Sequence, residues 1–249
     1  EQLGWRLGVE AYTFSRYTFF DTVDRAVEMG IPYVGGLSFQ QVGGGIQKNL
    51  DPNLTDDEIE QVRLKLASAG VRMLTYFIQE IPGDEEGCRK VFEFARKLGI
   101  ETFMTEPKLE ALDTVERFCD AYNIKVGLHN HDRNASPNYW SPEAILKVCK
   151  GRSPRMGACA DIGYWMRGGI DPVEGVRKLG SRLITIQMHD LNERTPQGRD
   201  VPWGTGAGGT ERLILEMHRH KIRPVMFGLE YSDKFEDNRA EVRQCAEFF

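Results

Sequence analysis

The stretch KVGLHNHD, residues 125–132, changes abruptly from apolar residues to histidine, asparagine and aspartate. Its first half has the character of a buried strand, and its second half carries two of the five histidines of the chain. Seven further stretches begin with a similar β-branched, apolar or aromatic run: RLGVEAYTF (6–14), YVGGLSFQ (33–40), RMLTYFIQ (72–79), TFMTEP (102–107), RMGACADIG (155–163), LITIQMHD (183–190) and PVMFGLEYS (224–232). We therefore predict eight buried strands.

Amphipathic helical segments separate these strands, and capping residues mark their ends. Thr55 and Glu58 form a capping box, and Gly70 follows at the C-terminal end of the same segment. Ser141 and Asp171 each precede a proline, which is the pattern of an N-cap followed by proline at the first helical position. Each predicted strand is thus followed by a predicted helix.

Strand followed by helix, repeated eight times over 249 residues, is typical of a (β/α)8 TIM barrel that forms one domain over residues 1–249. A doubly wound open sheet is the alternative. Such a sheet usually carries a glycine-rich turn after its first strand, and here that place is taken by AYTFSRY (11–17). The glycine-rich stretch GTGAGG (204–209) is interpreted as a flexible loop, with a phosphate cradle as the alternative.

The composition of the chain limits the classes of partner that it is expected to bind. The net charge of −5 argues against nucleic acid, which binds basic faces, and favours a small molecule. No apolar run approaches the roughly 20 residues that span a bilayer, and no signal segment opens the chain, so no membrane partner is expected. The chain starts at Glu1, which leaves a cytoplasmic location open beside a periplasmic one after removal of a signal peptide; a homo-oligomer is equally open. The five cysteines have no metal-binding spacing and are predicted to be buried thiols: Cys88, Cys119, Cys149, Cys159 and Cys245.

Polar residues follow the apolar runs at the ends of five predicted strands. The set comprises Glu106, His129, His131, Asp161, His189 and Glu230. The carboxyl ends of barrel strands form the rim of the active site, so these side chains are expected to converge. Each alone could be a helix cap, an ion-pair partner or a hydrogen-bonded core residue. Together, three carboxylates and His189 predict a site for a divalent metal ion (Mn²⁺, Mg²⁺, Co²⁺ or Zn²⁺).

Three segments carry a resemblance to a known family: ADIGYWMRGGIDP (160–172), HD (189–190) and GLEYS (228–232). With them the whole chain resembles a xylose isomerase-like TIM barrel of the sugar phosphate isomerase/epimerase family. The resemblance implies that Asp161, His189 and Glu230 bind a divalent metal on which sugar oxygens chelate. Tyr164 departs from the histidine that the family has there, and HNH replaces the strand-five glutamate that many members use as fourth ligand.

A subset resembling inosose dehydratases and keto-glycoside lyases has a histidine-rich fifth strand and a glutamate at the end of the fourth. By this resemblance Glu106 is predicted to be the fourth metal ligand, with His129 as the alternative. Side chains alternate along a strand, so His129 and His131 are expected to face the barrel mouth together while Asn130 points away. Imidazole suits proton transfer, and the two histidines, with Glu230, are the predicted catalytic residues; a hydrogen-bonding role for either histidine is the alternative.

Four further residues near strand ends are predicted to bind substrate: Tyr12, Tyr76, Trp165 and Arg167, with Tyr231 as a weaker candidate. His218 and His220 are predicted to lie on the surface. The resulting hypothesis is a metal-dependent sugar isomerase or epimerase that removes a proton alpha to the carbonyl of a sugar or keto-sugar, or a lyase that adds elimination. The alternatives are a phosphodiesterase related to apurinic-site endonucleases and a sugar-binding barrel without turnover.

Overall fold

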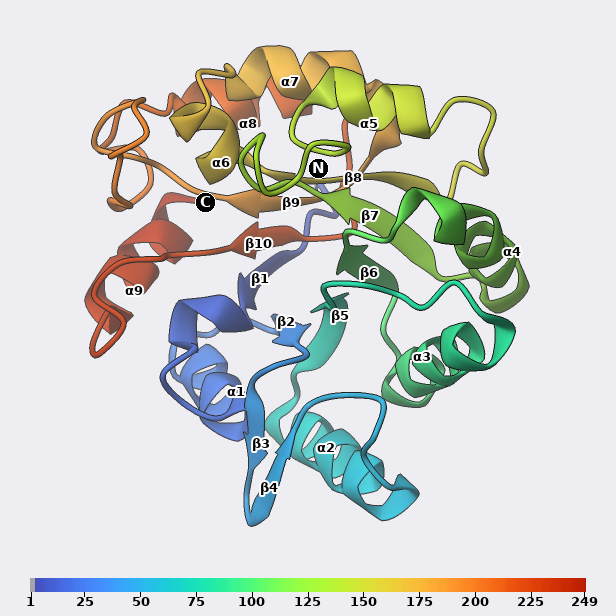
Figure 1. Ribbon diagram of the computed structural model, residues 1–249. Coiled ribbons are helices and arrows are strands. Elements are labelled where there is room, and N and C mark those ends of the chain that lie inside the picture. Colours follow the sequence, from blue (N-terminus) through green and yellow to red (C-terminus); the bar gives the residue numbers. More distant parts are fainter. Residues whose placement is uncertain (1–2) are drawn as a thin grey trace.

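Eight parallel strands close into a barrel, and a ring of helices surrounds it (Figure 1). The computed structural model describes residues 3–249. Around the barrel the strands follow the order β1, β10, β9, β8, β7, β6, β5, β2. Their bounds are β1 (Leu7–Glu10), β2 (Tyr33–Leu37), β5 (Arg72–Phe77), β6 (Thr102–Thr105), β7 (Lys125–His129), β8 (Met156–Asp161), β9 (Leu183–Met188) and β10 (Phe227–Leu229). Closure confirms the predicted (β/α)8 fold and excludes the open sheet.

The helices begin and end where the sequence places its caps. They are α1 (Phe19–Glu28), α2 (Asp56–Ala69), α3 (Glu85–Leu98), α4 (Leu112–Tyr122), α5 (Pro142–Val148), α6 (Ile162–Arg167), α7 (Pro172–Leu179), α8 (Thr210–Arg219) and α9 (Arg239–Phe248). The capping box of Thr55 and Glu58 is present, and Gly70 ends α2 at a φ of 66°. Ser141 and Asp171 accept hydrogen bonds from the first turns of α5 and α7. The predicted helix ends are therefore confirmed.

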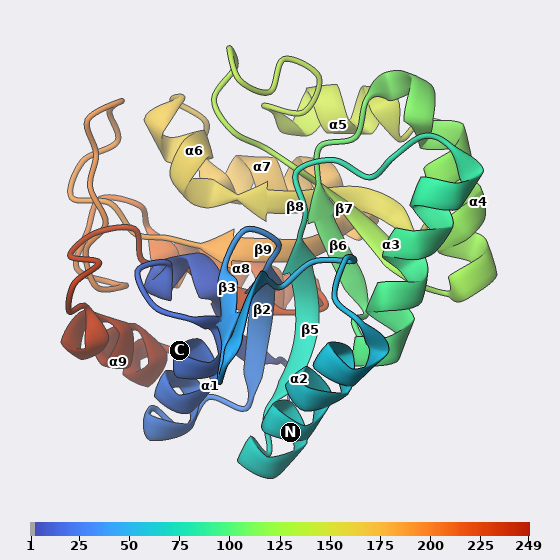
Figure 2. The same ribbon diagram turned by 60° about the horizontal axis from the view of Figure 1, so that its bottom comes forward.

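The strands are buried on both faces, because apolar side chains fill the barrel and the layer between strands and helices. All five cysteines are buried free thiols, as predicted. A two-stranded hairpin, β3 (Gln41–Gly43) and β4 (Ile46–Asn49), follows β2 outside the barrel, as Figure 1 shows; Figure 2 shows β3 from another side. No helix within residues 3–249 combines the length and the apolar character needed to cross a membrane.

The glycine-rich loop between β9 and α8 is held by a buried carboxylate. The backbone amides of Gly204 and Gly206 donate to Oδ2 of Asp190 at 2.9 and 3.1 Å, and that of Gly208 donates to Oδ1 at 2.8 Å. These amides are the donors that a phosphate cradle would need, and the carboxylate of Asp190 already uses them. The alternative interpretation of this stretch as a phosphate cradle is therefore wrong.

Candidate active site

A cavity of about 210 Å³ opens at the carboxyl ends of the strands. One water needs only about 10–15 Å³ by the same measure, so the cavity has room for a small organic molecule. The lining residues come from most of the strand ends: Glu10, Ala11, Tyr12, Gly36, Leu37, Phe39, Phe77, Gln79, Met104, His129, His131, Asp161, Tyr164, Gln187 and Glu230. Five of them carry a carboxyl or an imidazole group: Glu10, His129, His131, Asp161 and Glu230.

Asp161, the last residue of β8, converges with His189 and Glu230, which directly follow β9 and β10. The three side chains do not hydrogen-bond to one another, and we refer to them as the open cluster. One ligand atom from each lies within 4.8 Å of the others. Nε2 of His189 is 3.6 Å from Oδ1 of Asp161 and 3.8 Å from Oε1 of Glu230. These separations exceed hydrogen-bonding distance, and the buried Nε2 has no hydrogen-bond partner. A buried polar atom without a partner is unusual in a folded protein and points to a ligand or ion that would satisfy it.

The other nitrogen of His189 is fixed by Asp200, a buried residue of the loop after β9. Nδ1 of His189 donates to Oδ1 of Asp200 at 2.7 Å, and the backbone amide of Ser232 donates to Oδ2 at 3.0 Å. Burial opposes protonation of His189, but Asp200 and Asp161 outweigh it and raise the pKa of His189 to about 9. A carboxylate behind an imidazole is the arrangement that orients histidine ligands in metal sites.

The two carboxylates of the open cluster are held differently. Oδ1 of Asp161 caps α6 by accepting from the amide of Tyr164 at 3.0 Å, and the side chain of Asn130 bonds both backbone groups of Asp161. Burial opposes ionisation of Asp161, but His189 and His129 lower its pKa to about 2. Oε2 of Glu230 accepts from Nε2 of Gln187 at 2.7 Å. Burial raises the pKa of Glu230 to about 7, with His189 opposing and Asp161 adding to the rise.

The open cluster fits a divalent cation. Two carboxylates and an imidazole are suitable ligands for Zn²⁺, Mn²⁺ and related ions. The unpartnered Nε2 of His189 faces both carboxylates, and Asp200 holds that ring in place. The carboxylates of Asp200, Asp161 and Glu230 that raise the pKa of His189 make this position favourable for positive charge. Asp161, His189 and Glu230 are therefore the residues that could hold such an ion.

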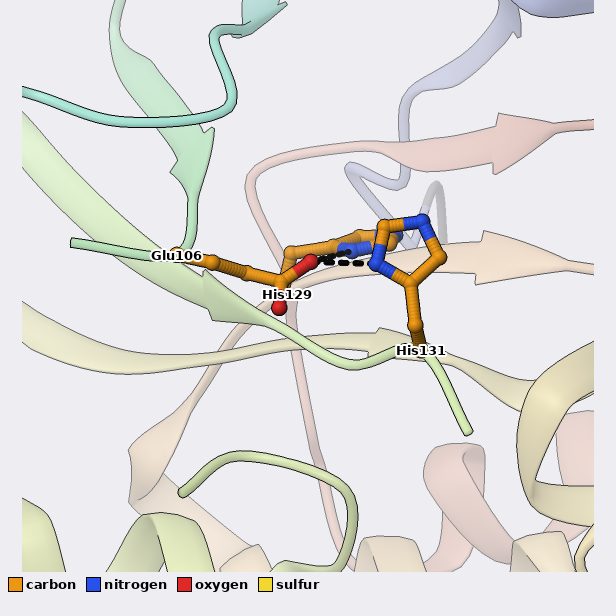
Figure 3. A group of neighbouring side chains, drawn as sticks. All are labelled: Glu106, His129 and His131. Carbon is orange, nitrogen blue, oxygen red and sulfur yellow. Dashed lines mark hydrogen bonds and ion pairs between the residues drawn. The ribbon is translucent and has the colours of Figure 1, made fainter. Parts of the chain in front are cut away.

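A second group, which we call the closed cluster, consists of Glu106, His129 and His131 (Figure 3). Nδ1 of His129 lies 3.3 Å from Oε1 of Glu106, and Nδ1 of His131 bonds the same oxygen. The hydroxyl of Ser136 donates to the other oxygen, Oε2. Burial opposes ionisation of Glu106, but these three bonds lower its pKa to about 2. Both carboxylate oxygens of Glu106 are thus already hydrogen-bonded.

His129 joins the two clusters. Its Nε2 is 3.7 Å from Oδ2 of Asp161, while its Nδ1 faces Glu106. Burial opposes protonation of His129, but Asp161 and Glu106 raise its pKa to about 10. His129 and His131 both line the cavity while Asn130 points to β8, as the alternation of the strand predicts. Of the two candidates for fourth ligand, His129 thus faces the open cluster directly.

Two of the predicted substrate-binding residues lie in the core. The Tyr76 side chain points away from the cavity, between β5 and the helices, and its hydroxyl donates to the carbonyl of Leu50 at 2.6 Å. Trp165 is fully buried against Gly175 of α7. The prediction that Tyr76 and Trp165 contact substrate is wrong, because proximity to a strand end does not decide on which side of the barrel wall a ring packs.

The remaining predicted residues divide between the pocket, a loop and the surface. Tyr12 lines the cavity. Arg167 is outside the lining; its Nε donates to the carbonyl of Gly198 at 3.0 Å and it lies 3.7 Å from Asp200, so it holds the loop after β9. Tyr231 is buried, again outside the lining. His218 and His220 are exposed, as predicted.

Glu10 is a site residue that the sequence analysis missed. It ends β1, is 2% exposed and lines the cavity. A Cβ atom at Gly35 or Gly228 would lie 1.8 or 2.1 Å from its carboxylate oxygens, so both glycines make room for it. Burial, with Glu230 adding to the effect, raises the pKa of Glu10 to about 8. The signal was available, because Glu10 ends an apolar run as Glu106 and Glu230 do.

A closed parallel barrel whose strand ends carry carboxylates and imidazoles around a cavity defines the structural class. The family described as xylose isomerase-like TIM barrel matches residues 23–249, and the chain belongs to this family. No curated protein is similar enough to be matched.

Several solved protein structures have the same fold as this chain. A crystal structure of a putative uncharacterized protein from Parabacteroides distasonis is 32% identical, with 98% of this chain and 97% of that one covered and a TM-score of 0.78. D-psicose 3-epimerase in the presence of D-fructose is 12% identical over 98% of this chain and 97% of that one, with a TM-score of 0.76. An IOLI protein with a binding zinc atom is 12% identical over 97% and 95%, with a TM-score of 0.75. At such low identity the last two show a shared fold alone.

Proposed function

We propose that the protein is a divalent-metal-dependent enzyme that removes a proton alpha to the carbonyl of a sugar or keto-sugar, as an isomerase, epimerase or lyase. The observation that carries this proposal is the open cluster of Asp161, His189 and Glu230, with the unpartnered Nε2 of His189 facing both carboxylates. The family supports it, and structures of the same fold include a D-psicose 3-epimerase, a probable 3-DHS dehydratase and a zinc-binding protein.

The metal would be held by Asp161, His189 and Glu230, and His129 completes the set better than Glu106 does. His129 directs Nε2 towards Asp161 at 3.7 Å, whereas both oxygens of Glu106 bond His129, His131 and Ser136. When bound, a divalent cation supplies Lewis acidity, which stabilises negative charge on a neighbouring sugar oxygen.

His131 is the proposed acid and base. Its Nδ1 bonds the ionised Glu106, so its Nε2 is left for a substrate in the cavity that it lines. Glu106 orients the ring, as the aspartate of a catalytic triad orients its histidine. An elimination would need an acid near the leaving oxygen, and the buried carboxyl of Glu10, whose pKa is raised by burial to about 8, lines the same cavity.

The phosphodiesterase alternative has less support. No Lys or Arg is among the cavity residues within the described chain, whereas three carboxylates line it. The cavity therefore offers none of the Lys or Arg contacts that usually bind the phosphates of DNA. The non-catalytic barrel has no specific observation in its favour, since both clusters and a cavity are in place.

The test is hydrogen exchange with solvent. The protein is stripped of metal, reloaded with Mn²⁺, Mg²⁺, Co²⁺ or Zn²⁺ in turn, and incubated in D₂O with aldoses, ketoses, inososes and 3-keto-glycosides. We expect deuterium to enter a carbon next to a carbonyl in one substrate class, only after reloading, with NMR identifying the carbon. Equal exchange by the stripped protein would refute the metal requirement, and cleavage of abasic DNA without any exchange would favour the phosphodiesterase.

A further inference from the structure

The end of β8 that carries Asp161 is held to β7 by a side chain in place of the backbone. The backbone pairing of the two strands ends at His129 and Cys159, two residues before Asp161. Beyond this point Oδ1 of Asn130 accepts from the backbone amide of Asp161 at 3.0 Å, and Nδ2 of Asn130 donates to its carbonyl oxygen at 2.9 Å. The side-chain amide has the same donor and acceptor as a backbone peptide group, so it continues the pairing of the strands as far as Asp161.

The end of β10 is held to the segment after β1 in a similar way. The pairing of β1 with β10 ends at Val9 and Leu229, one residue before Glu230. The hydroxyl of Thr13 donates to the carbonyl of Leu229 at 3.2 Å and accepts from the backbone amide of Tyr231 at 3.2 Å. One hydroxyl therefore fixes the backbone on both sides of Glu230.

Asn130 and Thr13 are placed to act on the carboxylates of the open cluster without touching a ligand themselves. Both side chains are fully buried, and neither is among the residues of the described chain that line the cavity. Each bonds backbone groups at, or directly beside, Asp161 or Glu230. Burial of a polar side chain costs free energy, and these hydrogen bonds offset that cost. They also give each carboxylate a fixed place.

A fixed place matters here because the two carboxylates share one neighbour. Oδ1 of Asp161 and Oε1 of Glu230 lie 3.6 and 3.8 Å from Nε2 of His189. Like charges held around one point in a buried site repel each other more strongly than they would in water. Strand ends that could move would let the carboxylates separate, and the free energy needed to bring them together again would weaken the binding of an ion.

We propose that Asn130 and Thr13 are positioning residues that hold Asp161 and Glu230 at the spacing a divalent cation needs. Asn130 acts between β7 and β8, and Thr13 acts between β1 and β10. This inference rests on the proposed function, because it concerns the residues behind the same metal site.

Ion binding tests this role separately from turnover. Metal-free protein is titrated calorimetrically with MnCl₂ and, in a second series, with ZnCl₂, and the ion that the wild type binds more tightly is used for the comparison. Thr13→Val removes the hydroxyl and keeps a branched side chain of similar size, so the affinity should fall by about 10- to 100-fold, the range typical of residues behind metal ligands. Thr13→Ser keeps the hydroxyl and should recover most of that loss. Asn130→Ala should lower the affinity by at least as much as Thr13→Val.

Two matched variants separate positioning from a general loss of stability. Thr185→Val removes a buried hydroxyl of β9 that donates to the carbonyl of Met226 at 3.1 Å. Gln40→Ala removes a buried amide that donates to the carbonyls of Phe14 and Tyr17 at 3.2 and 3.0 Å. Neither Thr185 nor Gln40 lines the cavity. Both variants should lower the melting temperature of the metal-free protein about as much as the tested variants do, and should leave ion affinity close to wild type.

Three results would overturn the inference: wild-type affinity in Thr13→Val, an equal loss of affinity in Thr185→Val, or a loss that Thr13→Ser does not recover. Should Asn130→Ala fail to fold, these three variants decide alone. A wild type that binds an ion while both positioning variants bind it equally well would refute the inference and leave the proposed function standing. A wild type that binds neither Mn²⁺ nor Zn²⁺ would refute the metal site of the proposed function, and the inference with it.

Discussion

The two clusters of ionisable residues at the barrel mouth both consist of carboxylates and imidazoles, but their hydrogen bonding differs. In the closed cluster Glu106 bonds His129, His131 and Ser136 directly. In the open cluster Nε2 of His189 stands 3.6 and 3.8 Å from two carboxylates and bonds neither. A buried group that lacks a partner is costly, whereas a satisfied one fixes the orientation of its neighbours. Under the proposed function, cation binding belongs to the open cluster with His129 as the added ligand, and proton transfer belongs to His131 of the closed cluster.

Removing a carboxylate from the open cluster should have the largest effect. Asp161→Ala is expected to abolish stoichiometric metal binding and to lower the exchange rate by about 10⁴ or more, because the Lewis acid contributes several kcal/mol and each 1.36 kcal/mol is a factor of ten. Metal content by atomic emission and the exchange rate check this. An Asp161→Ala protein that is active without bound metal would refute the proposal that the open cluster binds a metal needed for the reaction.

Asp161 also caps α6, so this variant needs a structural control. Asp161→Asn keeps an oxygen for the amide of Tyr164 and removes only the charge; it should fold normally and still bind metal poorly. Asp171→Ala removes an N-cap from α7, away from the cavity, and should retain both metal and activity. Metal loss in Asp171→Ala would mean that the lost cap, rather than a lost ligand, causes the effect.

Removing the acid and base of the closed cluster should separate metal from chemistry. His131→Ala is expected to keep metal near stoichiometric while exchange falls by about 10² to 10⁴, the usual range for a lost general acid or base. His218→Ala, which removes an exposed histidine of α8, serves as the control and should change neither quantity. Loss of metal in His131→Ala would place that histidine among the ligands, and unchanged exchange would return the proton transfer to the carboxylates.

A smaller effect is expected from the residue behind the open cluster. Asp200→Asn keeps an oxygen that can accept from Nδ1 of His189 but removes the charge, so metal affinity should fall by about 10- to 100-fold, the range typical of such partners. Competition with a chelator measures it. Asp190→Asn, which alters a side chain that bonds the amides of the glycine-rich loop and not the ring of His189, should leave the affinity closer to wild type. Equal losses in the two variants would indicate that loop order, rather than the charge on Asp200, sets the affinity.

The barrel can be predicted well from the sequence because the patterns that specify strands and helix ends are local. Strand periodicity and caps such as Thr55 and Asp171 depend on a few neighbouring residues, and eight repeats leave one closed arrangement. The open cluster is predictable for the same reason, since each member ends an apolar run. The strand alternation of His129 and His131 also follows from local geometry.

The rest of the site depends on contacts that no local rule gives. Asp200 lies in an irregular loop, and only the fold brings it to His189. Trp165 and Tyr76 stand near strand ends, yet their rings pack outside the cavity. Whether Glu106 points to a metal or to two imidazoles is a matter of side-chain orientation that spacing does not determine. Glu10 obeys the strand-end rule, but a single acid after a short apolar run is as typical of a helix cap or a surface ion pair as of an active site.

The smallest effect is expected at Glu10. This buried acid lines the cavity and belongs to neither cluster, so it tests where the division between the two clusters ends. Its pKa is raised from 4.5 to about 8, mainly by burial. Between these pH values folded Glu10 retains a proton that the unfolded chain has released, so it lowers the free energy of unfolding progressively as pH rises from 4.5 to 8. Glu10→Gln removes this titration and has the shape of the neutral acid. Measured by calorimetry, the melting temperature of the metal-free variant should therefore rise relative to that of the wild type between pH 5 and pH 8. Exchange by the metal-loaded variant at pH 6 should stay within a few-fold of wild type.

Glu110→Gln, at an exposed acid, controls for the loss of one charge and should follow the wild-type curve. Parallel curves for Glu10→Gln and wild type would show that Glu10 is ionised throughout, and would place its charge with the open cluster as a third carboxylate.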